Sequence, residues 1–340
     1  MTEIDVACPI CGDINRVDSG LASAYCQSCG AAFAVPVMRP EHEMPKNDLP
    51  PFTIRSGVLE RYNGSEPVVT VPDGVMAIGG QAFKDCDNVH RVVLPEGITE
   101  IQGSGDGMWG AFFGCSALES IALPKSLRRI GSNAFNGCKK LTNVKIPDDV
   151  NQIGAGAFSG CAELGLVKLP KGLRELSNDI FKGCVSLTEI RLNGNIKTIG
   201  DHAFENCHAL RALTIPPGVK TIGAYAFAGC FGLSELLLPG TVISLGASAF
   251  ADCRNLAVIT VPASIETFEN DGAGVRTFAG CSQLRKINLG KLPVNFMDVF
   301  ATTPWLEEYL MKNGLCRHCG GHFKGVFRKT CEVCGLVKDY

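Results

Sequence analysis

Nine cysteines recur along this 340-residue chain at an almost constant interval. Successive members are separated by 29, 23, 23, 23, 23, 23, 23 and 28 residues, and the nine are Cys86, Cys115, Cys138, Cys161, Cys184, Cys207, Cys230, Cys253 and Cys281. A constant period of this length is typical of a repeat array, in which each unit buries its apolar edge only against its neighbours. We therefore expect the chain to fold as a stack of similar coils.

Each repeat has two halves with different patterns. The first half reads L-x-x-[VIL]-x-[VIL]-P, where alternating apolar residues such as Val144 and Ile146 predict a short half-buried strand that Pro147 ends. The second half reads I-G-x-x-A-F-x-x-C and is too short for a full helix. It predicts a turn of 3₁₀ or α structure, with side chains such as Phe158 and Cys161 pointing into the stack.

This pattern resembles the BspA-like leucine-rich-repeat family over roughly residues 52–303, with nine repeats carrying the motif. The resemblance implies a curved right-handed solenoid with a parallel β-sheet on one face. Two loops are longer than the family pattern, between Ile101 and Phe112 and between Phe268 and Phe278. Many members of the family are exported to cell surfaces, but the acidic N-terminal segment here lacks the basic start and apolar stretch of an export signal. We expect a cytoplasmic protein with no membrane-spanning segment.

Eight further cysteines form four Cys-x-x-Cys pairs near the two chain ends, each followed by glycine. They are Cys8, Cys11, Cys26 and Cys29 at one end, and Cys316, Cys319, Cys331 and Cys334 at the other. Glycine lets the backbone curl so that its N–H groups reach the thiolates, and two such pairs can place four thiolates around one Zn²⁺. The pattern predicts zinc ribbons at 1–35 and 314–340, each with one structural zinc. His318 and His322 are competing ligands by position, although four cysteines suffice.

Two segments are predicted to connect or cap these parts. Residues 36–51 contain five prolines and several charges, the composition of an extended linker. Residues 304–313 form a short predicted helix with Thr303 as N-cap and Gly314 after the last turn. Its apolar face is expected to cap the open end of the solenoid, which spans 52–303.

The sequence carries no catalytic motif, so we expect a non-catalytic scaffold that binds a protein partner and no small-molecule substrate. The exposed strand residues Lys145, Lys168 and Arg191 are predicted to align on adjacent strands as a basic row suited to an acidic partner. Leu237 adds exposed apolar area to the same sheet face.

Two alternatives remain at the level of sequence. The basic C-terminal ribbon, with aromatic residues between its lysines and arginines, is compatible with nucleic-acid binding, although the net charge of −2 provides no general basic field. A lone Cys-x-x-Cys pair is also typical of a dithiol redox protein, but four pairs matched two by two favour metal. The repeat cysteines are expected to be buried, reduced thiols.

Overall fold

The computed structural model describes residues 3–7, 14–18, 23–28, 32–34, 50–211, 213–269, 276–325 and 329–337, and its chain divides into two units, 1–51 and 52–340. In the first unit, β1 (Glu3–Ala7) pairs with β2 (Ile14–Asp18) and β3 (Ser23–Tyr25) with β4 (Ala32–Ala34), both antiparallel. Cys26 is buried directly after β3. The other predicted N-terminal ligands, Cys8, Cys11 and Cys29, lie outside the described residues, as does the predicted linker apart from its last two prolines.

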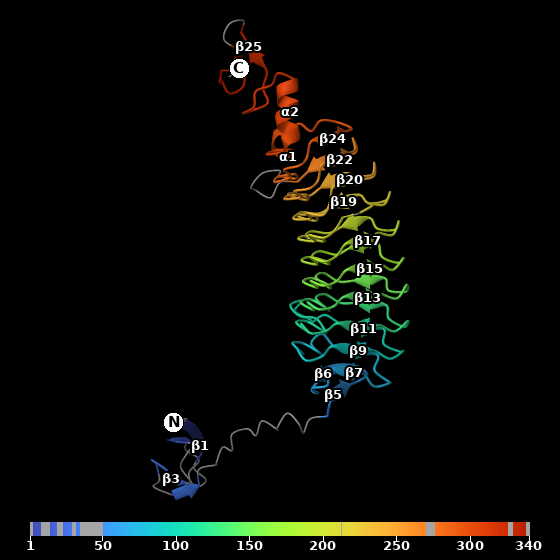
Figure 1. The fold of residues 1–340 in the computed structure, drawn as a ribbon. Coiled ribbons are helices and arrows are strands. Elements are labelled where there is room, and N and C mark those ends of the chain that lie inside the picture. Colours follow the sequence, from blue (N-terminus) through green and yellow to red (C-terminus); the bar gives the residue numbers. More distant parts are fainter. Residues whose placement is uncertain are drawn as a thin grey trace. The chain divides into compact units, whose positions relative to one another are not determined.

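The second unit is a solenoid of stacked parallel strands (Figure 1), which confirms the predicted fold class. The strand half of each repeat forms what we call the first sheet. It consists of three separate three-stranded stretches, with the strand orders β11-β9-β7, β13-β15-β17 and β20-β22-β24. The strands are β7 (Val68–Thr70), β9 (Arg91–Val93), β11 (Ser120–Ala122), β13 (Asn143–Lys145), β15 (Leu166–Lys168), β17 (Glu189–Arg191), β20 (Glu235–Leu237), β22 (Val258–Val261) and β24 (Lys286–Leu289).

A second parallel sheet runs beside the first and was not expected from the sequence. It is built from the isoleucine position of the I-G half, which Leu176, Leu245 and Phe268 occupy in three coils, and the residue before it, in strands of two residues that are too short to produce a periodic signal. After the hairpin β5 (Phe52–Arg55) and β6 (Val58–Tyr62) come β8 (Ala77–Ile78), β10 (Glu100–Ile101), β12 (Arg129–Ile130), β14 (Gln152–Ile153), β16 (Glu175–Leu176), β18 (Thr198–Ile199), β19 (Thr221–Ile222), β21 (Ser244–Leu245) and β23 (Thr267–Phe268). The rest of the motif forms the predicted turn, which begins directly after the glycine, as at residues 155–160.

The core of the solenoid is a column of stacked phenylalanine rings. From Phe83 to Phe300, each ring lies 4.8 to 5.7 Å from the next, nearly parallel to it, and is fully buried. Tyr62 continues the column at one end and Trp305 at the other, at 5.2 and 4.8 Å. The residue before each phenylalanine is buried too; it is alanine in most coils, but Ile180, Thr277 and Val299 show that a larger side chain is also accommodated where successive turns approach each other.

The residue before each repeat cysteine adopts a left-handed backbone, with φ between 56° and 77°. Glycine, asparagine and aspartate are the residues that tolerate this conformation most readily, and only these three occur at the position. They are Asp85, Gly114, Gly137, Gly160, Gly183, Asn206, Gly229, Asp252 and Gly280. The turn therefore selects these residue types for a backbone reason.

One predicted strand is absent from the described part of the first sheet. Residues 213–215 are not in strand conformation, although Leu213 and Ile215 carry the apolar alternation. Pro216 stands where Pro147 and Pro239 end the strands of other coils, so proline by itself does not account for the difference.

Two helices end the solenoid, α1 (Phe296–Val299) and α2 (Pro304–Lys312). As predicted, the side chain of Thr303 caps α2 by accepting a hydrogen bond from the Leu306 N–H at 3.3 Å. Leu306 and Leu310 are buried against the last coil, so α2 closes the apolar core. Neither of these helices is long and apolar enough to span a membrane, nor is any other helix in the described residues.

Candidate metal centre and interaction surfaces

Four cysteines converge immediately after α2. Their Sγ atoms all lie within 4.8 Å of one another, with Cys316 and Cys334 3.6 Å apart and Cys319 and Cys331 3.3 Å apart. Four sulfurs at tetrahedral Zn–S distances would be about 3.8 Å apart. The C-terminal ligand set predicted from the sequence is therefore brought together in a geometry that fits one zinc-sized ion, and neither His318 nor His322 belongs to the cluster.

Backbone hydrogen bonds shape the two Cys-x-x-Cys-Gly turns alike. The N–H of Gly320 donates to the carbonyl of Cys316 at 2.8 Å, and the N–H of Gly335 donates to that of Cys331 at 3.0 Å. Both glycines have positive φ, 71° and 74°. The short antiparallel pair β25 (Phe323–Lys324) and β26 (Thr330–Cys331) holds the two turns opposite each other. The glycines expected from the sequence thus perform the expected conformational role.

Local hydrogen bonding prepares one thiol of the cluster for ligation. The backbone N–H groups of Cys334 and Val333 donate to the sulfur of Cys331, and together with the thiol of Cys319 they lower its pKa to about 6. For Cys319 the N–H of Gly321 has the same lowering effect, but desolvation and the neighbouring sulfurs outweigh it and raise the pKa to about 12. A bound cation would relieve the repulsion between the thiolates, and metal ligation requires all four in that form.

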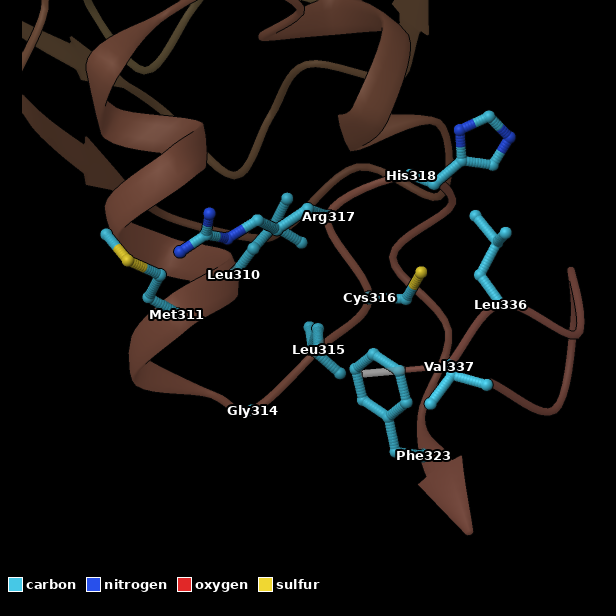
Figure 2. Close-up of a pocket in the computed structure, with 10 residues that line it drawn as sticks. All are labelled: Leu310, Met311, Gly314, Leu315, Cys316, Arg317, His318, Phe323, Leu336 and Val337. Atoms are coloured by element: carbon cyan, nitrogen blue, oxygen red, sulfur yellow. The ribbon is translucent and has the colours of Figure 1, made fainter. Parts of the chain in front are cut away.

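A partly apolar pocket of 350 Å³ lies between α2 and the cysteine cluster (Figure 2). Leu310 and Met311 contribute from the end of α2, and Leu315 and Cys316 from the segment that follows. The far side is formed by residues 336 and 337. The cysteine cluster therefore also holds one wall of this pocket in place.

The predicted basic row is in register on the first sheet. Lys145 is paired with Lys168, and Lys168 with Arg191, on β13, β15 and β17. Acidic neighbours partly neutralise two of the cations, since Arg191 contacts Glu189 at 2.8 Å and Lys168 contacts Asp148 at 3.5 Å.

Two leucines on the same face are strongly exposed. Leu166, on β15, is 60 % exposed, and Leu237, on β20, is 66 % exposed. The face therefore combines cations with apolar side chains, as the sequence predicted.

The repeat cysteines are free thiols, and eight of them are completely buried. Each of these eight donates its S–H to the phenylalanine carbonyl of the preceding coil, as Cys161 does to Phe135 at 3.2 Å. Cys86 has no such phenylalanine before it and is only half-buried. The sequence showed that the cysteines pack inside, but the hydrogen bond between coils became visible only in the structure.

Two histidine–carboxylate contacts were not predicted from the sequence. The Nδ1 atom of His90 lies 3.1 Å from Glu119, and that of His202 lies 2.8 Å from Glu205. The first pair joins neighbouring coils, and its spacing of 29 residues spans the longer loop, which obscured the regular period.

The repeats match the BspA-type leucine-rich-repeat region in six copies, over residues 61–185 and 197–315. Because the match covers well over half of the chain, the protein belongs to this family. No match to the flanking cysteine modules accompanies it. Among curated proteins, none matches the chain.

The solved structures similar to this chain include leucine-rich-repeat proteins of bacteria. A leucine-rich repeat protein from Bacteroides ovatus is 28 % identical, with a TM-score of 0.62, and the match covers 72 % of this chain and 63 % of that protein. This chain thus spans less than two thirds of that relative.

Two further structures show weaker similarity. A leucine-rich cell surface protein from Faecalibacterium prausnitzii is 21 % identical over 73 % of this chain and 95 % of its own, with a TM-score of 0.44. A leucine-rich repeat protein from T. pallidum is 28 % identical over 58 % of this chain and 82 % of its own, with a TM-score of 0.40.

Proposed function

We propose that this protein is a non-catalytic scaffold that binds an acidic protein partner on the exposed face of the first sheet. The observation that carries the proposal is the basic row, because three cations lie in register on adjacent strands and the acidic neighbours Glu189 and Asp148 offset only part of their charge. The exposed leucines 166 and 237 supply apolar contact area on the same face. Membership of a repeat family whose stacked strands form one extended surface supports a binding role.

We further propose that each cysteine module holds one structural zinc ion, Cys316, Cys319, Cys331 and Cys334 at the C-terminal end and the corresponding four at the N-terminal end. Zinc would cross-link the short chain segments, and four sulfur ligands leave no open position for catalysis. The free thiols of the repeats fit a reducing compartment, and the proposed location is the cytoplasm.

Charge reversal on the sheet face tests the scaffold. Protein carrying Lys145→Glu and Lys168→Glu is compared with wild type and with a control that carries Lys139→Glu and Lys140→Glu. Both control lysines are exposed on the turn that follows Cys138. Each tagged protein is used to capture partners from a lysate of the source cells, with and without nuclease. We expect an acidic protein that wild type and control retain and that the sheet-face variant loses.

Two outcomes would contradict the proposal. Equal capture by all three proteins would place the interface elsewhere on the molecule. Loss of capture after nuclease treatment would favour the nucleic-acid alternative, in which the basic C-terminal module makes the contact. Far-UV circular dichroism of both variants controls for folding.

A further inference from the structure

The first sheet ends at β24 with an unpaired edge. The N–H of Lys286 donates to Ala257 and the N–H of Gly290 donates to Val261, so residues of even number on this strand face β22. In a parallel ladder alternate residues face opposite neighbours, and the N–H and C=O groups of Ile287 and Leu289 therefore point away from β22. Among the described residues no strand pairs with that side of β24.

The apolar side chains of the same two residues are also incompletely covered. Ile287 and Leu289 are only half-buried, whereas their partners in the preceding coil, Ile259 and Val261, are 0 % and 2 % exposed. Helix α2 covers only the start of this edge, where the Trp305 N–H donates to the Leu284 carbonyl at 2.9 Å. Ile287 and Leu289 therefore lack the further extended strand that lies beside the corresponding residues of an inner coil.

The charges around this edge specify the partner further. Arg285, Lys286 and Lys291 are exposed on and beside β24; Glu308 of α2 acts on Arg285, whereas no acidic residue in the described part of the chain forms an ion pair with Lys286 or Lys291. An incoming strand would place alternate side chains beside Lys286 on the exposed face and beside Ile287 and Leu289 on the inner face. Acidic residues suit the first position and β-branched apolar residues the second.

We propose that the β24 edge is an acceptor site for an extended segment of a partner protein in which acidic and β-branched apolar residues alternate. The opposite edge of the first sheet, β7, is less suited because Pro67 and Pro72 flank it, and proline is a common protection of sheet edges. Stacking of a second copy end to end is disfavoured because β5 at one end and α2 at the other already lie beyond the terminal coils. The site uses the sheet edge and not its face, so it stands or fails independently of the proposed function.

The experiment measures binding of a fluorescein-labelled peptide, Glu-Val-Asp-Val-Glu-Val-Asp-Val with blocked ends, to the full-length protein by fluorescence anisotropy. Two further peptides carry N-methyl groups, one on all acidic residues and one on all valines. Because alternate N–H groups of a strand face opposite sides, we expect exactly one of the two to lose about 100-fold or more in affinity. Loss with the acidic set indicates parallel pairing, as in the solenoid, and loss with the valine set indicates antiparallel pairing.

A substitution on β24 tests the same contact from the side of the protein. Lys286→Glu should weaken binding of the unmodified peptide about tenfold or more, whereas Lys220→Glu, at an exposed site away from β24, should leave it unchanged. Absence of peptide binding, equal effects of both methylated peptides, or equal effects of the two protein variants would each overturn the proposal. Concentration-dependent self-association that Lys286→Glu abolishes would also overturn it, by assigning the edge to a second copy.

Discussion

Replacing one ring in the middle of the phenylalanine column should cost far more stability than removing an aromatic ring from the solenoid surface. Phe158 is fully buried between Phe135 at 5.3 Å and Phe181 at 5.7 Å, with nearly parallel rings on both sides. Removing a fully buried phenylalanine side chain costs about 4 kcal/mol, because burial is lost and a cavity remains. The rigid stacking of adjacent coils leaves little room for the cavity to collapse. We expect Phe158→Ala to lower the free energy of unfolding by about that amount.

The matched control is Phe231→Ala. Phe231 also lies against a ring of the neighbouring coil, His208 at 4.5 Å, but it is only half-buried and on the surface. Loss of this contact should cost about 1 kcal/mol. Urea unfolding followed by far-UV circular dichroism gives both values, and hydrogen exchange should show the loss of protection in the coils next to residue 158.

The result that would refute this reasoning is a similar destabilisation by the two variants. A cost below about 1.5 kcal/mol for Phe158→Ala would also refute it, since values that small are typical of sites that repack or are partly exposed. In either case the column would be a geometric consequence of the repeat and not a main source of its stability.

Three further predictions concern the cysteines and the turn backbone. Cys331→Ser should remove one zinc per chain in elemental analysis and make the C-terminal module sensitive to protease while the repeats stay folded; unchanged zinc content would contradict the site. Burial raises the pKa of Cys184 from 9.0 to about 12, so its folded state keeps a proton that the unfolded state loses above pH 9, and stability should fall between pH 9 and 12. Under reducing conditions Cys184→Ala should lessen this fall by about 1.4 kcal/mol per pH unit, and an unchanged pH slope in urea unfolding would count against the assignment. Gly183→Ala should destabilise by about 1 kcal/mol because φ is 72° there, whereas Asp252→Gly, with φ of 56°, should be neutral or stabilising in the same assay; the reverse order would exclude the backbone explanation.

Most of the repeat architecture could be predicted because its signals are local and repeated. The burial of Phe158 and Cys161 followed from a pattern that nine coils share, and an error in one coil would not have changed the interpretation. The cap of α2 was equally accessible, since Thr303 makes its hydrogen bond within one turn. The C-terminal ligand set was predictable from spacing alone, because two Cys-x-x-Cys-Gly turns have few ways to present their sulfurs.

The second sheet could not be predicted in the same way. Its strands contain two residues each, as in β12, and a strand of that length exists only because the neighbouring coils supply hydrogen bonds on both sides. Residues 213–215 show the reverse case. The apolar alternation that predicts a strand is present there, but the residues are not in strand conformation.

By itself the sequence determined the period, the inward-facing residues, the helix that closes the core and the cysteines that meet after it. All of these depend on chain-local chemistry: side-chain polarity, cap geometry and the spacing of sulfur ligands. Only the tertiary structure decided which hydrogen-bonding groups are satisfied. The donation of each buried thiol to the preceding coil and the unpaired N–H and C=O groups of Ile287 and Leu289 both depend on whether a neighbouring coil is present, because a parallel ladder is completed between coils and not within one.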